Sequence, residues 1–336
     1  MGKLKIPMLA RYAVNVALIA IFLVVGYIVT SSGVLTRALS FNINTVGIYI
    51  ILAVSLNIAA GYLGQLPLGH AGFMAVGAYS GAIFWKSGLL SGIPDVLAGL
   101  IIAGVVAAIF GVIIGIPALR LRGDYLAIIT LGFGEIIRVA IINLRSITGG
   151  TPGLQSIPKY SDFLLVYVCV VITCIAIHMM MKSRHGRAIL AIRENEIAAE
   201  ACGVQTTYYK VMAFSVSAFF AGVAGALYAG TAGRLDPGEF GFMTSINILV
   251  MVVLGGMGSM MGSMIAAAIL TSLPLMLQAL NEYRLIIYSL LLIAVMILKP
   301  SGLMGTYDFS LSYVLERVGG RAMRSRKEGG APDDDT

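Results

Sequence analysis

The sequence carries little charge. Of its 336 residues, 12% are charged and 58% are hydrophobic, whereas soluble domains carry about 25% charged residues. So little polar surface cannot cover a water-soluble fold of this size, and lipid must cover part of it. The composition excludes a soluble globular protein. It predicts an all-α, polytopic integral membrane helix bundle, because helices satisfy their own backbone hydrogen bonds in lipid.

Cysteine and histidine are also scarce. The three cysteines, Cys169, Cys174 and Cys202, lie in or beside apolar segments, so no disulfide framework is expected. The three histidines are widely separated and no Cys or carboxylate cluster stands at ligand spacing, which argues against a metal site. We expect no cofactor bound by this chain.

The motifs of an ATPase and of an enzyme are missing as well. No G-x-x-x-x-G-K-[ST] loop occurs, so the chain has no ATP site of that kind. The Gly-rich run GGMGSMMG (255–262) is apolar and indicates close helix packing or a tight turn. No Ser/His/Asp, Cys/His or paired-carboxylate constellation stands at a membrane surface, so we expect no enzyme. The basic residues lie at the ends of apolar runs, not in a nucleic-acid patch.

Long apolar runs are abundant instead. About 20 apolar residues cross a bilayer as a helix, and we expect about ten transmembrane helices. The last run is short and needs Arg284 and Lys299 to reach the two surfaces. No charge marks the boundaries at 61–65 and 261, so each adjoining pair is either two spans or one broken or re-entrant helix. The ten runs are Tyr12–Ser32, Ile43–Ala60, Leu66–Trp85, Val96–Ala118, Tyr125–Ile142, Phe163–Met181, Val211–Gly230, Gly241–Met260, Gly262–Leu280 and Leu285–Leu298.

The basic residues give the expected orientation. With ten spans and a cytoplasmic N-terminus, 16 of the 23 Lys and Arg residues fall on the inside and six on the outside. This bias favours both termini in the cytoplasm. We therefore expect a transmembrane domain over residues 1–305 and a cytoplasmic tail over 306–336. Small-residue pairs at Gly77/Gly81, Gly111/Gly115 and Gly258/Gly262 predict helix-contact faces.

The most informative polar segment is HGRAILAIRENEIAAEACG (185–203), inside the cytoplasmic loop 182–210. Its apolar residues recur at helical spacing, with Asn195 the exception, and Gly203 could end a helix. The pattern predicts an amphipathic cytoplasmic helix. Such a helix either lies on the bilayer surface or docks into a groove of a partner, and the pattern alone leaves both open.

Few polar groups stand inside the expected spans. Glu135 and Arg138 are three residues apart and can share one helix face, as a structural ion pair or as part of a pathway or gate. Gln65 and His70 flank a short turn and the start of a span, where His70 is either a packed, hydrogen-bonded residue or a substrate contact.

Several motifs together resemble the branched-chain amino-acid permease family of ABC importers, its LivM-type subunit in particular. Pro67 departs from the family pattern, in which we expect Ser at that position. The matching motifs are GYLGQLPLGHAGFMAVGAY (61–79), LRGDYLAIITLGFGEIIR (121–138), TGGTPGL (148–154), GRAILAIRENEIAAEACGV (186–204), VVLGGMGSMMG (252–262) and KPSGLMG (299–305).

The resemblance implies a permease subunit in the bacterial plasma (inner) membrane. It would import branched-chain amino acids with a second related permease, ATP-binding cassette subunits that use ATP, and a periplasmic substrate-binding protein. The wider family also serves urea, amides and other small amino acids. A self-contained secondary transporter is the competing class, but it needs more buried charges than Glu135 and Arg138.

The resemblance also assigns roles to residues. ATPase coupling falls on the segment 186–203. The resemblance does not fix the role of the candidate translocation or gating residues, which are Gln65, His70, Glu135 and Arg138. The outside loop 143–159 is either a docking surface for the binding protein, through Thr148, Gly149, Gly150 and Gly153, or a plain connector. The coupling residues are Arg193, Glu194, Glu200, Ala201 and Gly203.

Overall fold

The computed structural model describes residues 36–88, 92–121 and 123–276, with a few positions between 283 and 303. The expected first span at Tyr12–Ser32, most of the last at Leu285–Leu298 and the tail at 306–336 lie outside the described residues. Within them every regular element is a helix, and the one extended pairing is an isolated bridge between Leu154 and Leu235. The all-α class is therefore confirmed.

Most of the helices follow one another with short connections, and the longest, 149–162, joins α6 to α7. In chain order they are α2 (Arg37–Asn57), the π-helical turn η1 (Ile58–Tyr62), α3 (His70–Ser87), α4 (Ile93–Ala118), α5 (Asp124–Asn143), α6 (Arg145–Thr148), α7 (Phe163–Lys182), α8 (Arg184–Glu194), α9 (Glu196–Ala201), α10 (Thr206–Ala232), the 3₁₀ turn η2 (Pro237–Phe240), α11 (Phe242–Gly255) and α12 (Met260–Met276).

Five of the described helices are long and apolar enough to cross a membrane: Ala38–Tyr62, α4, α5, α7 and α10. The chain is thus polytopic. Helix α3 is not among the five, and α11 and α12 are shorter apolar helices. The arrangement of ten spans stays a prediction.

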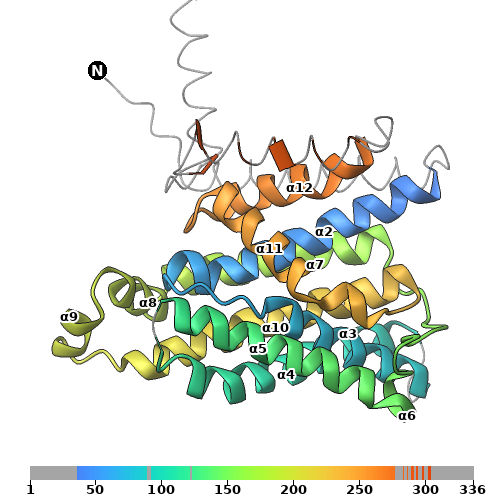
Figure 1. Ribbon diagram of the computed structural model, residues 1–336, viewed down its shortest axis with the longest axis horizontal. Helices are drawn as coiled ribbons and strands as arrows, with labels where there is room; N and C mark the ends of the chain where they lie inside the picture. The colour runs from blue at the N-terminus through green and yellow to red at the C-terminus, as the bar shows by residue number, and fades with distance from the viewer. Residues whose placement is uncertain are drawn as a thin grey trace, which may run out of the picture. The chain divides into compact units, whose positions relative to one another are not determined.

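Helix α10 runs through the middle of the bundle and packs against α4, α3 and α2 (Figure 1). Glycine makes these contacts close. A Cβ on Gly77 of α3 would collide with the backbone of Gly222 on α10, and one on Gly225 with the carbonyl of Met74. Gly81 and Gly111 likewise face Ala226 and Ala218 of α10. The predicted small-residue contact faces of α3 and α4 are confirmed, since only small residues let helix backbones approach so closely.

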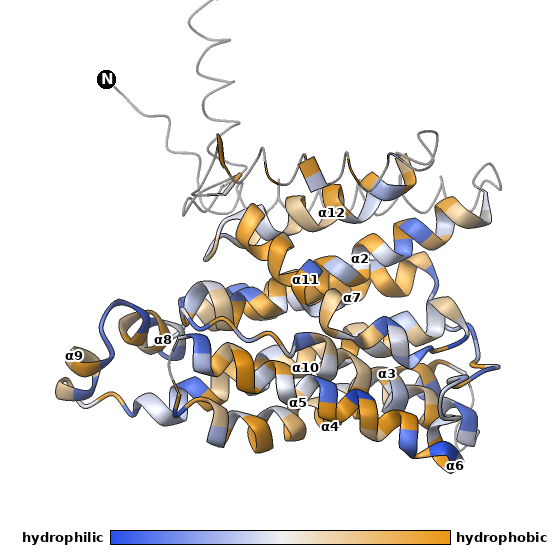
Figure 2. Cartoon of the chain, viewed as in Figure 1, coloured by the Kyte–Doolittle hydropathy of each residue, from blue (hydrophilic) through white to orange (hydrophobic). Residues whose placement is uncertain are grey.

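The outer faces of α4 and α5 are apolar. Ile101, Ile109 and Ile113 on α4 are more than half exposed, as are Ile128 and Ile136 on α5. Figure 2 shows these two helices with hydrophobic residues along their length. Exposing such an apolar surface to water is unfavourable, so contact with lipid or with an apolar second subunit is expected.

Helix α3 begins inside the bundle. The chain leaves η1 at Tyr62, continues without helix to Gly69, and starts α3 at His70. The His70 Nε2 lies 3.0 Å from the Ser55 hydroxyl, and Ser55 is seven residues, about 10 Å, back from the end of η1. The unwound backbone is held in place by Thr130 of α5, whose hydroxyl accepts a hydrogen bond from the Leu68 N–H (2.9 Å). The boundary near 61–65 is therefore a non-helical connection at depth, of the kind tolerated where protein surrounds it.

The second ambiguous boundary is a tight turn. Residues 256–259 join α11 to α12, with positive φ at Gly256 (+109°) and Gly258 (+89°), a conformation that favours glycine. The backbones of Gly255 and Gly262 come so close that a Cβ on either would collide with the other. Both predictions for this run, a tight turn and close helix packing, are confirmed, whereas Gly258 belongs to the turn and not to a helix face.

Candidate functional site

The segment between α7 and α10 forms two helices in place of the one amphipathic helix that the spacing predicts. Asn195 interrupts it with extended backbone (φ −159°, ψ 109°), and its side-chain oxygen accepts a hydrogen bond from the Ala198 N–H at 3.1 Å. The Ser183 hydroxyl caps α8 in the same way. Asn favours such an N-cap over a helix interior because its side chain satisfies an unpaired N–H there. Asn195, the one polar residue in the apolar pattern, is therefore the position at which α8 ends and α9 begins.

The pair α8–α9 has a buried face and an exposed face. Ile189, Ile192 and Ala199 pack into a cluster that also holds Ile58 of η1 and Ile177 of α7. All five residues to which the resemblance assigns coupling are exposed, and so is Ile197 of α9, at 72%. The sequence analysis did not single out Ile197. The structure does, because a large apolar side chain on the exposed face of α9 has no contact within the described part of the chain that buries it. The five exposed residues are Arg193, Glu194, Glu200, Ala201 and Gly203.

Two polar contacts tie α9 to the first turns of α10. The Thr206 hydroxyl donates to the Glu200 carboxylate at 2.6 Å, and the Lys210 ammonium pairs with Glu196 at 2.5 Å. The Lys210 side chain is only 5% exposed and that of Glu196 is 21% exposed. Sequence reasoning missed Lys210, because its spacing of 14 residues from Glu196 crosses a turn. These two contacts connect α9 to the start of the central helix α10.

Arg193, one of the five residues that the resemblance assigns to coupling, also lies against the two helix breaks. Cβ atoms built on Gly64 and Gly258 would lie 3.1 Å from its Cγ and 3.0 Å from its Nη1. These glycines belong to the two helix breaks, at 63–69 and 256–259. Asn57 of α2 links the same region, since its side-chain oxygen accepts from the Gly258 N–H at 2.9 Å. One side chain of α8 thus lies against both breaks.

Glu135 and Arg138 form the ion pair that their spacing predicts. The Arg138 Nε donates to Glu135 Oε2 at 2.7 Å, and both side chains are about one third exposed, at 31% and 32%. The other carboxylate oxygen, Oε1, accepts the Phe242 N–H at 3.1 Å. Phe242 is the first residue of α11, so the negative carboxylate sits at the positive end of that helix.

The first turn of α11 brings the candidate pathway residues together, with one exception. The Ser245 hydroxyl accepts a hydrogen bond from the Ala71 N–H at 3.1 Å, and Ala71 follows buried His70 in the chain. In the same turn, the Phe242 N–H donates to Glu135. Gln65 lies elsewhere, in the 63–69 connection, and its N–H donates to the Ala59 carbonyl. The starts of α3 and α11 and the middle of α5 therefore form one junction within the bundle.

The loop after α6 has a specific backbone conformation that hydrogen bonds hold in place. Gly149, Gly150 and Gly153 all have positive φ, and Thr148 is buried with its hydroxyl 2.6 Å from the Ile141 carbonyl. Leu154 pairs through both backbone hydrogen bonds with Leu235 beyond α10. Of the four predicted docking residues only Gly149 is exposed, so the others shape the loop. Its outward side chains are Thr151, Pro152, Gln155 and Ser156.

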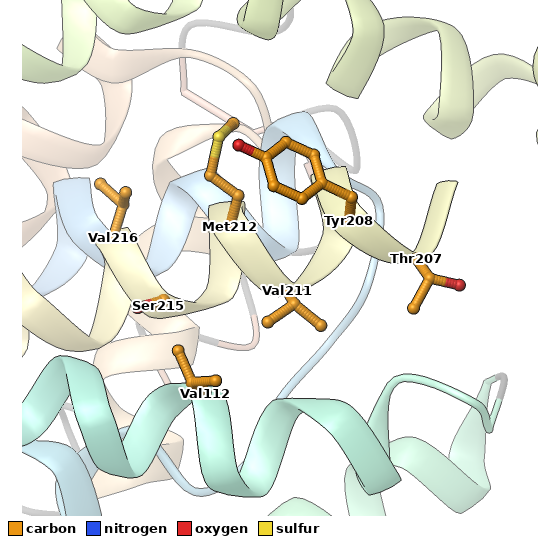
Figure 3. A pocket seen from close by; sticks show the side chains of 7 residues that line it. All are labelled: Val112, Thr207, Tyr208, Val211, Met212, Ser215 and Val216. Carbon is orange, nitrogen blue, oxygen red and sulfur yellow. The ribbon is translucent and has the colours of Figure 1, made fainter. Parts of the chain in front are cut away.

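A shallow apolar groove of about 400 Å³ runs between α4 and the first half of α10 (Figure 3). Val211 of α10 points toward Val112 of α4 across it, while Met212 and Tyr208 project from the other side of the α10 ribbon. None of the predicted site residues lines this groove. Its lining resembles a lipid-facing crevice more than a site for a polar solute.

No group of three or more His, Cys, Asp or Glu side chains that could hold a metal ion occurs in the part of the chain that the structure describes.

A bundle of apolar helices with internal breaks and an exposed helical pair defines a multi-pass membrane protein. Residues 38–296 match the sequence profile of the permease component of branched-chain amino acid transport systems. Because the match covers most of the chain, this protein belongs to that family.

Individual relatives agree with the family. The high-affinity branched-chain amino acid transport system permease protein LivM of Salmonella typhimurium is 37% identical over 294 residues, covering 76% of this chain and 68% of the relative. The corresponding permease LivH of Escherichia coli is 27% identical over 290 residues, covering 79% and 94%. A probable LivM of Methanocaldococcus jannaschii is 24% identical over 311 residues, covering 76% and 90%. No solved structure matches the chain.

Proposed function

We propose that this chain is the permease subunit of an ATP-driven importer of branched-chain amino acids, and that it takes up energy through α8–α9. The observation that carries the coupling is the exposure of the same five residues that the family motif assigns, on a helix pair tied to α10 by Glu200–Thr206 and Glu196–Lys210. The 37% identity to a LivM permease supports the substrate class.

The proposed assembly has four kinds of subunit. This chain pairs with a second related permease, ATP-binding cassette subunits bind ATP beneath them, and a substrate-binding protein docks on the opposite side. In this arrangement α8–α9 lies in the cytoplasm, both termini are cytoplasmic, and the loop 149–157 faces the periplasm of a bacterial inner membrane. The chain itself binds no cofactor and catalyses no reaction.

The transport function is tested with labelled leucine, isoleucine and valine in proteoliposomes that hold the complete assembly. We expect accumulation that requires ATP, the binding protein and this chain. Uptake of urea or an amide in place of these amino acids would keep the importer class and change the assigned substrate. Ion-driven uptake by this chain alone would contradict the importer.

The coupling role is tested with Glu200→Lys. Reversing the charge should lower the leucine imported per ATP hydrolysed at least fivefold, because the exposed carboxylate faces the ATPase. The substitution also removes the hydrogen bond from Thr206. Thr206→Val is the matched control, since it removes that hydrogen bond and keeps the charge, and it should stay within twofold of wild type. Equal losses in the two variants would make Glu200 a structural residue only.

The docking role of the loop is tested at its outward side chains. Gln155→Lys and Ser156→Lys add charge without touching the buried frame at Thr148 and Gly153. Docking predicts that binding-protein-stimulated ATP hydrolysis falls several-fold while basal hydrolysis is unchanged. A full response in both variants would leave the loop as a connector.

A further inference from the structure

The Glu135–Arg138 pair stands well inside the membrane-spanning part of α5. Along a helix that rises 1.5 Å per residue, Arg138 lies about 8 Å and Glu135 about 12 Å from the last residue of α5, Asn143. Both positions fall within the roughly 30 Å of hydrocarbon that a 20-residue helix crosses. A charge at such a depth is costly unless water, a partner charge or a ligand surrounds it.

Glu135 and Arg138 differ in how many of their polar atoms are hydrogen-bonded. Both oxygens of Glu135 are used, one by Arg138 Nε and the other by the Phe242 N–H. Arg138 makes that single ion pair through Nε, and among the described residues its terminal nitrogens Nη1 and Nη2 have no acceptor. About a third of each side chain is exposed, so the guanidinium is not sealed in the core.

The Glu135 carboxylate has two positive partners, the Arg138 guanidinium and the N-terminus of α11, which carries about half a positive charge. Glu239 of η2, which packs on α5, adds a negative charge nearby, and its carboxylate accepts a hydrogen bond from the Tyr228 hydroxyl. The open end of the guanidinium, and not the sum of the charges, therefore favours an anionic group. Two parallel N–H groups at the end of a guanidinium match the two oxygens of a carboxylate, which is the strongest pairing this side chain makes.

We infer that the terminal nitrogens of Arg138 form a subsite for the α-carboxylate of an amino acid, at the junction of α5 and the start of α11. The inference rests on the proposed import of amino acids and adds the group by which the path recognises them. Glu135 positions the guanidinium through Nε, and α11 holds Glu135. An anion can reach the Nη1 and Nη2 end of the guanidinium because Glu135 is bonded to Nε.

Transport by the complete assembly gives the first test. At saturating leucine-loaded binding protein, Arg138→Gln should lower leucine uptake at least tenfold while stimulated ATP hydrolysis stays within twofold. Arg138→Lys keeps the charge without the fork and should retain more uptake than Arg138→Gln. Glu135→Gln keeps an oxygen that can accept from Arg138 Nε, so the guanidinium is held less firmly but not lost, and uptake should fall less than threefold. Equal losses of uptake and of thermal stability in Arg138→Gln and Glu135→Gln would show a structural ion pair and overturn the subsite.

A binding measurement separates the subsite from the transport function. Met243 lies two residues beyond Gly241, whose Cβ position is 3.9 Å from Arg138 Cδ, and Met243 is 71% exposed. In a Cys202→Ser background, alkylation of Met243→Cys should slow at least threefold in millimolar leucine. Leucinol, which keeps the ammonium and side chain but lacks the carboxylate, should not protect, and Arg138→Gln should abolish protection by leucine.

Alanine and glycine extend the probe beyond branched substrates. Protection by any zwitterionic amino acid, without protection by its amino alcohol, supports the subsite even if leucine is not transported. Equal protection by leucine and leucinol, or by none of these compounds in an assembly that transports leucine, overturns it.

Discussion

The core around α10 and the pair α8–α9 are held by different forces. Where α3 and α4 meet α10, glycines such as Gly222 and Gly225 bring backbone against backbone with no side chain between them. The pair α8–α9 instead rests on a few apolar side chains and on two polar links, Glu200–Thr206 and Glu196–Lys210.

The difference shows where the molecule can move. Backbones in contact cannot slide without opening voids or clashes, since packed interiors deform little. The Glu200–Thr206 hydrogen bond joins an exposed carboxylate to α10 and can exchange with water or another subunit at little net cost, typically about 1 kcal/mol. The Glu196–Lys210 pair is more buried and holds more firmly. We therefore propose that a push on α8–α9 reaches α10 through the buried Lys210–Glu196 pair and the apolar contacts of Ala199, and moves α3, α4 and α10 together.

The largest effect is expected in the core. Gly225→Ala places a Cβ against the Met74 carbonyl and the Ala78 N–H, and only a shift of whole helices relieves it. We expect destabilisation of about 3 kcal/mol, the upper part of the range for overpacking, measured by thermal unfolding of the purified protein in nanodiscs. Gly132→Ala on α5 is the matched control, because nothing lies within 4 Å of its Cβ position. Similar stability of the two variants would refute backbone contact as the force that holds the core.

An intermediate effect is expected at the buried link. Glu196→Gln leaves the Lys210 ammonium, 5% exposed, without its carboxylate. The loss should be about 2 kcal/mol, below the roughly 3–5 kcal/mol of a fully buried pair because Glu196 is partly exposed. Lys210→Met removes the more buried charge and should be less destabilising, as the same unfolding measurement shows. The reverse order would mean that Lys210 is better hydrated than its exposure indicates.

The smallest effect is expected at the break between α8 and α9. Asn195→Ala removes the cap on Ala198 and should destabilise the protein by about 1 kcal/mol, with faster hydrogen exchange confined to residues 196–201. Asn195→Asp keeps a capping oxygen and serves as the control. If alanine leaves exchange in α9 unchanged, the cap does not hold this helix.

Local patterns predicted much of the fold. Composition and apolar runs indicated the helical membrane class, and the long helices α4, α5, α7 and α10 follow the expected runs closely. Spacing of three predicted the Glu135–Arg138 pair, and the Gly-rich run at 255–262 predicted its turn and close contact. Each of these rests on residues near one another in the sequence, where helical periodicity is informative.

What the sequence did not reveal depends on distant contacts. The start of α3 at His70 and not at Leu66 is set by Thr130 and Ser55 from other helices. The cap on α11 comes from Glu135, 107 residues away. Helical spacing predicted one helix across Asn195, where the structure has two. Apolar periodicity carries no information about a side chain that caps a new helix.

The central claim, that energy enters through the outer face of α8–α9, is tested most directly by crosslinking. A photoreactive amino acid at Ile197, 72% exposed on α9, should crosslink to the ATP-binding subunit in the assembled importer, and ATP should change the yield. The same probe at Ile109 on the outer face of α4 should give no such product. Crosslinking to lipid alone at Ile197, with or without ATP, would contradict the account and leave α8–α9 as a surface helix pair.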